Sequence, residues 1–241
     1  MRYAVVTGIT KGIGRAVAER LLQEDFFVIG NYAADDSAAN AFTRANENYA
    51  QRLFVRKQEL SSYETACAFA EQIVSVTQTV DVLVLNSGTT NLTPFGEITK
   101  EDWGRVMDVN LNAPFFLIQK LRNCMAADRG RIILLGSLMG EYPHARSIPY
   151  GVSKAALHEL ARYLIKYFSP RGVTVNAVVP GFVDTPWQSG KEPEHRKRIE
   201  NKLALHRFAK PEEIAALCMH LLENQYINGE VLHIDGGYSY E

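Results

Sequence analysis

Tyr150 and Lys154 are four residues apart, a spacing that places both side chains on one face of a helix. A phenol has a reference pKa of about 10, so it acts as an acid or base near neutral pH only if that pKa falls by about 3 units. A neighbouring lysine charge and the positive end of a helix with Pro149 in its first turn both lower it. The pair predicts a proton-transfer site, although the spacing alone also suits a solvated helix face.

Two more polar residues stand where they would complete this site. Ser137 comes directly after an apolar strand pattern, where its hydroxyl would hold a carbonyl oxygen beside Tyr150. Asn110 lies four residues before Pro114, which has no N–H, so the Asn110 carbonyl is left free for a water that relays protons to Lys154. Taken singly, the serine also suits a strand-end cap and the asparagine a simple proline kink.

A glycine-rich turn, Thr7-Gly8-Ile9-Thr10-Lys11-Gly12-Ile13-Gly14, lies between the first strand pattern and the first helix pattern. Glycine lets the backbone approach a pyrophosphate closely, and the helix N-terminus attracts the anion. At this junction the turn predicts a dinucleotide site, although a merely tight turn would share the pattern.

The end of the second strand pattern bears on the type of dinucleotide. It reads Gly30-Asn31-Tyr32-Ala33 and has no carboxylate to bond the adenosine ribose hydroxyls, while Lys11 offers a cation to a 2′-phosphate. This favours NADP(H) over NAD(H). Asp35 and Asp36 follow closely enough to keep NAD(H) open.

The elements that must position these residues are short apolar runs separated by longer amphipathic stretches. The runs are Tyr3–Thr7, Phe26–Gly30, Leu53–Val55, Val82–Leu85, Arg131–Leu135, Thr174–Val179 and Val231–Ile234. Continuously apolar strands belong to a parallel sheet covered on both faces, which predicts a doubly wound α/β sandwich of about seven strands. Helix patterns over 106–121 and 152–168 are apolar around a wide surface, which suits a fully covered core helix or, as we favour, a homo-oligomer (dimer or tetramer).

Composition excludes several classes of protein. The chain has 26 Lys+Arg and 27 Asp+Glu, so it lacks the basic field of a general nucleic-acid or membrane-surface binder. No apolar stretch approaches the ~20 residues that span a bilayer, and a strand pattern begins directly after Arg2, so we expect a cytoplasmic protein. Cys67, Cys124 and Cys218 are odd in number and far apart, which favours inert buried thiols and no metal site.

These motifs resemble the short-chain dehydrogenase/reductase family across essentially the whole chain. The glycine-rich turn matches the family's cofactor turn, and residues 180–185 match its nicotinamide loop. The residues that match its catalytic tetrad are Asn110, Ser137, Tyr150 and Lys154. The resemblance implies a single Rossmann-type domain over 1–241 in which NADPH delivers hydride to a carbonyl and Tyr150 donates the proton.

The resemblance also implies the coenzyme contacts. Val183 and Thr185 would engage the nicotinamide carboxamide, and Glu59 stands where the family usually has Asp. Leu85 departs from the family's N-N-A-G motif, whereas Asn86 and Gly88 match it. The implied cofactor set is Gly8, Thr10, Lys11, Gly12, Ile13, Gly14, Asn31, Tyr32, Glu59, Leu60, Asn86, Ser87, Gly88, Tyr150, Lys154, Pro180, Gly181, Val183 and Thr185.

Within the family, the chain resembles 3-oxoacyl-acyl-carrier-protein reductases through residues 171–181, 207–214, 228–230 and 235–237. That implies reduction of a 3-oxoacyl thioester, carried by acyl carrier protein or coenzyme A. The stretch 142–148 is bulkier and more polar than the small residues expected there. The predicted substrate-pocket residues are Met139, Tyr142, His144, Ile148, Phe182 and Trp187.

The segment 186–210 would cover the pocket. From Lys191 to Lys210 it holds seven Lys or Arg against three Asp or Glu. A solvated amphipathic helix explains this excess, with Leu203, Leu205 and Phe208 inside. An anion-seeking rim for a phosphopantetheine arm or an acidic carrier protein, extended by Arg129 and Arg171, also explains it.

Two other functions share parts of the pattern. An oxidative dehydrogenase of a sugar, polyol or steroid alcohol would use the same tetrad, and a preference for NAD would favour it. A non-catalytic nucleotide-sensing protein would keep only the fold, and the complete tetrad argues against it.

Overall fold

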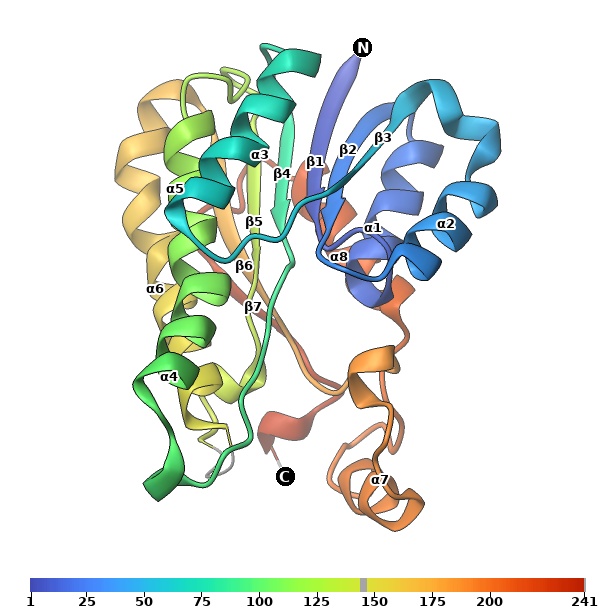
Figure 1. Cartoon of the computed structure of the whole chain (residues 1–241), viewed down its shortest axis with the longest axis vertical. Coiled ribbons are helices and arrows are strands. Elements are labelled where there is room, and N and C mark those ends of the chain that lie inside the picture. Colours follow the sequence, from blue (N-terminus) through green and yellow to red (C-terminus); the bar gives the residue numbers. More distant parts are fainter. Residues whose placement is uncertain (144–146, 241) are drawn as a thin grey trace.

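The computed structural model describes residues 1–143 and 147–240 (Figure 1). Within these residues seven parallel strands form one sheet in the order β3-β2-β1-β4-β5-β6-β7. The strands are β1 (Arg2–Thr7), β2 (Phe26–Tyr32), β3 (Leu53–Lys57), β4 (Val82–Leu85), β5 (Arg131–Leu135), β6 (Thr174–Pro180) and β7 (Val231–Ile234). The direction of winding reverses between β1 and β4, the switch point at which α/β sheets bind ligands. The predicted doubly wound parallel sheet is confirmed.

The helices form two layers, one on each face of the sheet (Figure 1). One layer contains α1 (Gly12–Gln23), α2 (Asp36–Ala45) and α8 (Pro211–Glu223). The other contains α3 (Tyr63–Val76), α4 (Lys100–Met107), α5 (Ala113–Leu121) and α6 (Ile148–Phe168). The short helix α7 (Pro193–Glu200) lies apart from both layers, beyond the strand ends.

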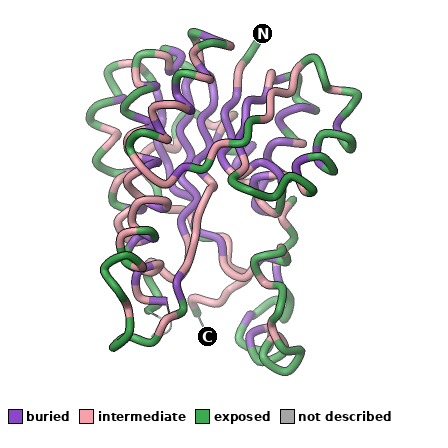
Figure 2. Tube along the Cα trace, viewed as in Figure 1, coloured by how far each residue is buried: buried purple, intermediate pink, exposed green. Residues whose placement is uncertain are grey.

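The central strands are buried on both faces, as their continuous apolar sequences predict (Figure 2). Alternate residues of one strand belong to different cores: Val5 packs in the cluster under α3, α5 and α6, and Val6 packs in the cluster under α1 and α8. The sheet is therefore a rigid platform, and its strand ends hold the polar residues of interest.

The apolar stretch 106–121, expected as one helix, is interrupted. Between α4 and α5 the backbone widens into a π-helical turn at Asp108–Asn112. Pro114 follows it, and because proline cannot donate to the preceding turn the regular hydrogen-bond ladder cannot pass through this point. The turn carries Asn110 into the interior, where it is 1% exposed.

Two other expectations meet different outcomes. Leu203 and Phe208 are buried beneath α7, but Leu205, also expected inside, is 62% exposed because the chain turns at this point and its N–H bonds to the Gly236 carbonyl. All three cysteines are free thiols, but only Cys218 is buried as expected, and burial raises its pKa to about 12, whereas Cys67 and Cys124 are partly exposed.

The described part of the chain has neither a membrane-spanning helix nor a clustered set of metal ligands. No helix there has the length and apolar character needed to cross a membrane. No group of three or more His, Cys, Asp or Glu in the same residues lies arranged to hold a metal ion.

Gly30 links the sheet to the glycine-rich turn, because a Cβ at this position would lie 2.5 Å from the tip of the Ile9 side chain. We expect Gly30→Ala to lower the free energy of unfolding by about 1–3 kcal/mol, since Ile9 must move within a packed core. Gly96→Ala is the control, because its Cβ would meet nothing within 4 Å. Urea unfolding of both variants tests this, and equal midpoints would contradict the assigned packing.

Candidate active site

The glycine-rich turn has the shape that a pyrophosphate needs. Gly8 and Gly12 adopt positive φ angles of 69° and 54°, which other residues rarely adopt, and a Cβ on Gly14 would overlap the Gly8 carbonyl oxygen. The first turn of α1 contains no acidic residue, and its N-cap residue Lys11 makes no side-chain capping bond. The first N–H groups of α1 therefore remain available to an anion.

Side chains from neighbouring strands hold this turn in place. Thr7 Oγ1 accepts hydrogen bonds from the N–H groups of Asn86 (2.8 Å) and Ser87 (2.9 Å). Asn86 Nδ2 donates to the Thr7 carbonyl at 2.9 Å, and Asn31 Oδ1 accepts the Gly8 N–H at 3.3 Å. Asn31 and Asn86, both predicted as cofactor contacts, thus bond the turn itself with their side chains.

The end of β2 carries balanced charges. Tyr32 donates its hydroxyl hydrogen to Asp36 at 2.9 Å, and Lys57 pairs with the other oxygen of that carboxylate at 2.7 Å. Lys11 pairs with Asp35, which also caps α2. Both aspartates therefore reach the predicted adenosine-ribose site, together with two lysines.

The predicted tetrad residues converge at the ends of β4 and β5. The Lys154 side chain is buried, and its Nζ donates to the Leu135 carbonyl at 2.6 Å and lies 5.7 Å from the centroid of the Tyr150 ring. The Ser137 hydroxyl lies near enough to the Tyr150 side chain to act on the pKa of the phenol. A Cβ on Gly88 would lie 3.8 Å from Lys154 Nζ, so the loop after β4 closes over the same group.

Asn110 joins the tetrad through a residue that the sequence analysis missed. Its Oδ1 accepts the Thr89 N–H at 2.8 Å, and its Nδ2 donates to the Thr89 carbonyl and to Ser153 Oγ, both at 2.9 Å. Ser153 Oγ donates in turn to the Tyr150 carbonyl at 2.7 Å. The sequence held one indication of this role, because Ser153 lies three residues after Tyr150, on the face that the helix buries.

The pKa of Tyr150 moves in the direction opposite to the expectation. Burial raises it, and only the neighbouring Ser137 hydroxyl lowers it. Burial also lowers the pKa of Lys154 to about 8. The lysine does not lower the Tyr150 pKa because its proton is directed at the Leu135 carbonyl and the phenol itself is desolvated. At neutral pH Tyr150 is therefore a protonated phenol, which can donate a proton.

The predicted nicotinamide loop reaches both parts of the site. The Thr185 side chain would lie 3.1 Å from a Cβ on Gly12, so this loop touches the glycine-rich turn. Val183 is buried against the core under α1 and α8. The Trp187 ring lies over Tyr150, with 5.9 Å between the ring centroids.

Other predicted residues have varied surroundings. Met139 donates its N–H to Ser137 Oγ at 3.2 Å, and Ile148 begins α6. Phe182 packs in an aromatic cluster with Phe208 and Tyr238, which supports the base of α7. The remaining positions are Thr10, Ile13 and Gly14 at the start of α1, Glu59 exposed after β3, Leu60 in the core, Pro180 and Gly181 at the end of β6, and His144 outside the described residues.

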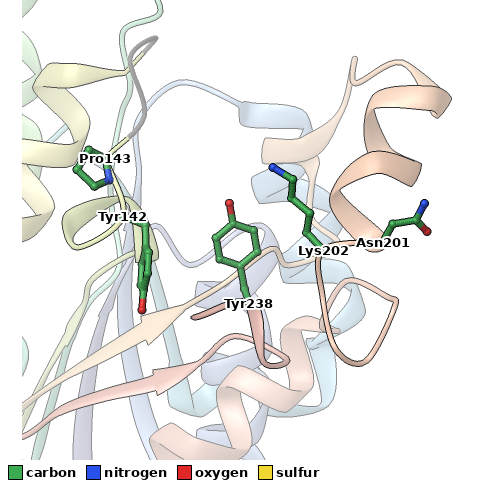
Figure 3. Close-up of a pocket in the computed structure, with 5 residues that line it drawn as sticks. All are labelled: Tyr142, Pro143, Asn201, Lys202 and Tyr238. Atoms are coloured by element: carbon green, nitrogen blue, oxygen red, sulfur yellow. The ribbon is translucent and has the colours of Figure 1, made fainter. Parts of the chain in front are cut away.

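A cleft of about 430 Å³ opens between the loop after Ser137 and the residues that follow α7 (Figure 3). It is lined by Tyr142, Pro143, Asn201, Lys202 and Tyr238. Only Tyr142 was predicted. The others were missed because the residues after α7 and the C-terminal turn meet the loop after Ser137 only in the folded chain.

The basic segment 191–210 is only partly neutralised. Arg196 pairs with Asp184 at 2.9 Å and with Glu200 at 3.0 Å, which ties α7 to the nicotinamide loop. Arg129 and Arg171, expected to extend this surface, do not. Arg129, just before β5, pairs with Asp81, just before β4, and Arg171 lies just before β6. All three are therefore at the end of the sheet where the strands begin. Parallel strands carry their starts and ends on opposite edges, so these two arginines are remote from α7.

A doubly wound sheet with a phosphate-binding turn at its switch point and a buried Tyr–Lys pair beside it defines a nicotinamide-dependent oxidoreductase. The family described as "Enoyl-(Acyl carrier protein) reductase" matches residues 8–239. The chain belongs to the short-chain dehydrogenase/reductase family, whose fold binds a nicotinamide cofactor, and it acts on C=O or CH–OH groups.

Named relatives differ in substrate. The chain is 32% identical over 239 residues to the 3-oxoacyl-[acyl-carrier-protein] reductase FabG of Aquifex aeolicus, covering 98% of this chain and 96% of the relative. It is 31% identical over 242 residues to glucose 1-dehydrogenase 2 of Bacillus subtilis, covering 98% and 94%. A blue fluorescent protein from a metagenomic library, solved in complex with NADPH, has a TM-score of 0.92 at 30% identity, covering 99% of this chain and 98% of that one.

The buried Lys154 should make stability depend on pH. Its pKa falls from 10.5 to about 8 on folding, so the unfolded chain binds more protons between these values and the free energy of unfolding rises with pH across this window. We expect the wild-type chain to gain up to about 3 kcal/mol relative to Lys154→Met between pH 8 and 10.5. Urea unfolding at a series of pH values measures the difference, and parallel curves would show that the charge is not buried.

Proposed function

We propose that the protein is an NADPH-dependent reductase that converts a 3-oxoacyl thioester, linked to acyl carrier protein or coenzyme A, to its 3-hydroxyacyl form. The observation that carries the proposal is the protonated Tyr150, with Ser137 beside it and the buried Lys154 one helix turn away. Reduction of a carbonyl needs a proton donor, whereas oxidation of an alcohol needs the phenolate.

The chain's own residues perform the polar part of this reaction. Ser137 and Tyr150 hold the carbonyl oxygen, and Tyr150 donates its proton as negative charge develops there. A nicotinamide coenzyme bound in this crevice would supply the hydride that the carbonyl carbon needs. Lys154 holds the nicotinamide ribose, and Asn110, fixed by Thr89 and Ser153, holds the water that returns a proton toward Tyr150.

The cleft supports a substrate with an anionic arm. Lys202 lines it opposite Tyr142, and Figure 3 shows its amine directed into the space beside Tyr238. The phosphate of a phosphopantetheine arm suits such a group. An acidic carrier protein suits the adjoining α7, where Lys197 and Arg198 are exposed.

NADP(H) is the coenzyme we propose. The strand β2 contains no carboxylate side chain. Lys11 and Lys57 both lie beside the predicted ribose site. Their ion pairs with Asp35 and Asp36 are solvent-exposed, so exchanging these partners for a 2′-phosphate costs little.

A homo-oligomer completes the proposal. On α6, Val152, Tyr163 and Tyr167 are 43%, 79% and 54% exposed in the single chain, and Trp103 of α4 is 41% exposed. An apolar and aromatic surface on two adjacent helices is a typical subunit contact. We propose that a second copy covers it.

Absorbance of the nicotinamide tests the activity, with an acetoacetyl thioester offered on coenzyme A and on acyl carrier protein. We expect turnover with NADPH that improves on the carrier protein, and a loss of about 1,000-fold or more in Tyr150→Phe, because the proton donor is gone. Tyr226→Phe, at a fully exposed position after α8, is the control and should match the wild type. Retained activity in Tyr150→Phe rejects the assigned proton donor. Oxidation of glucose with no reduction of the thioester would favour a sugar dehydrogenase instead.

The coenzyme preference rests on Lys11. We expect Lys11→Met to weaken NADPH binding about tenfold while NADH binding stays within about twofold, because one charged hydrogen bond to the 2′-phosphate is lost. Lys197→Met, which removes an exposed lysine on α7, should alter neither. Coenzyme fluorescence titrations give the dissociation constants. An equal loss for both coenzymes would assign Lys11 to the pyrophosphate instead.

A further inference from the structure

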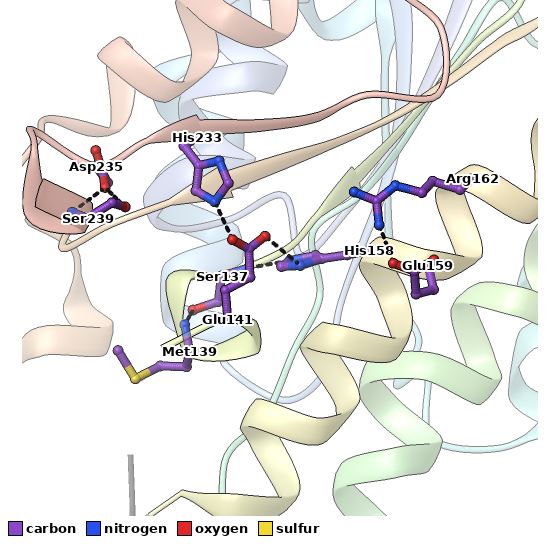
Figure 4. Close-up of polar contacts among 9 residues, drawn as sticks. All are labelled: Ser137, Met139, Glu141, His158, Glu159, Arg162, His233, Asp235 and Ser239. Carbon is purple, nitrogen blue, oxygen red and sulfur yellow. Dashed lines mark hydrogen bonds and ion pairs between the residues drawn. The ribbon is translucent and has the colours of Figure 1, made fainter. Parts of the chain in front are cut away.

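A buried histidine contacts the backbone of Ser137. His158 lies on α6 one turn after Lys154, and its Nε2 accepts the Ser137 N–H at 3.3 Å. Its Nδ1 lies 3.4 Å from Glu141 Oε1, and the other oxygen of Glu141 lies 2.7 Å from Nε2 of His233 on β7. Figure 4 shows the continuous chain of polar contacts from Ser137 to His233.

The surroundings of His158 are shaped to the imidazole ring. A Cβ on Gly136 would overlap its Nε2, and a Cβ on Gly140 would lie 2.8 Å from its Cε1. The side chain is 4% exposed, whereas Glu141 and His233 are each 36% exposed. The two glycines therefore let the backbone around Ser137 wrap closely about the ring, and the chain of contacts leads from the interior to the surface.

The geometry determines where the ring proton sits. To accept the Ser137 N–H, Nε2 must keep its lone pair, so the proton belongs on Nδ1, facing Glu141. Burial holds the pKa of His158 near 4, with Glu141 opposing that effect and the charges of Lys154, Arg162 and His233 reinforcing it. The ring is therefore neutral at physiological pH.

The contact with the imidazole is one of three that position Ser137, because its Oγ also accepts the Met139 N–H at 3.2 Å and its carbonyl accepts the Gly140 N–H at 2.9 Å. Ser137 lies two residues after the end of β5. The residue before it, Gly136, donates its N–H to the Val178 carbonyl of β6. Beyond that bond, the backbone N–H of Ser137 is anchored only to the imidazole among the described residues. A small rotation here would swing the hydroxyl away from Tyr150.

We propose that His158, held in its Nδ1–H tautomer by Glu141, is a positioning residue that fixes Ser137 for carbonyl binding, and that His233 ties this pair to β7. This inference rests on the role proposed above for Ser137. Glu141 acts on the reaction only through the ring, and neither residue is assigned a contact with substrate.

Two replacements of His158 test the proposal. His158→Leu keeps the size of the side chain and removes the acceptor, and we expect kcat to fall about 100-fold with NADPH affinity unchanged, because the hydroxyl is misplaced. His158→Gln offers a carboxamide oxygen near the Nε2 position and should restore most of the loss. His220→Gln on α8, where the side chain is exposed, is the control.

The pH profile separates positioning from simple stability. In the wild type, protonation of Nε2 at acid pH breaks the bond to Ser137 and lowers kcat, whereas His158→Gln lacks this limb. Equal kcat in wild type and His158→Leu, or an acid limb that persists in His158→Gln, would overturn the proposal.

The tautomer can be measured without any activity. Nitrogen NMR of histidine-labelled protein should show His158 with its proton on Nδ1, and Glu141→Leu should shift the ring toward the Nε2–H form. A ring that already carries its proton on Nε2 in the wild type overturns the inference. If Tyr150→Phe retains turnover while the Nδ1–H form is seen, the proposed function fails and the link between His158 and Ser137 stands.

Discussion

The hydrogen bond from Lys154 to the Leu135 carbonyl is the contact on which this site depends. It buries an ammonium group, and no carboxylate among the described residues neutralises it. Such a charge is tolerated only where polar groups surround it, and burial accordingly lowers its pKa to about 8. The bond fastens α6 to the end of β5 and places Tyr150, one turn earlier, beside Ser137. The burial that lowers the pKa of Lys154 also raises the pKa of Tyr150, so the phenol stays protonated.

Around this contact, each polar side chain is held by the backbone of a different element. Asn110 bonds the backbone N–H and the backbone carbonyl of Thr89 in the loop after β4. Ser153 links Asn110 to the first turn of α6. His158 bonds the backbone of Ser137 after β5. Because rigid strands and helices supply these anchors, the reacting groups are positioned before any ligand binds.

The two ends of the crevice have different electrostatic character. Near the end of β2, two lysines and two aspartates balance one another in exposed ion pairs. Near α7, Arg196 is neutralised by Asp184 and Glu200, and Lys202 faces the cleft. The exposed ion pairs near β2 can exchange partners at little free-energy cost. Near α7, in contrast, Lys202 lines the cleft. This contrast supports the proposal of NADP(H) at one end and an anionic substrate arm at the other.

The sequence determined the features that depend on local periodicity and local chemistry. Val82–Leu85, Arg131–Leu135 and Val231–Ile234 are strands with the expected bounds, because buried parallel strands are continuously apolar. The glycine-rich turn and the pair formed by Tyr150 and Lys154 could likewise be predicted, because short spacing decides which residues share a turn or a helix face.

Only the tertiary structure decided the features that depend on distant partners and on burial. Glu141 and His233, 92 residues apart, meet because β7 packs beside β6, and nothing local marks the pair. The direction of the Tyr150 pKa shift was expected wrongly, because desolvation depends on the whole surrounding fold, whereas the spacing shows only that a lysine is near. Pairwise spacing is a property of the chain, but burial is a property of everything packed around it.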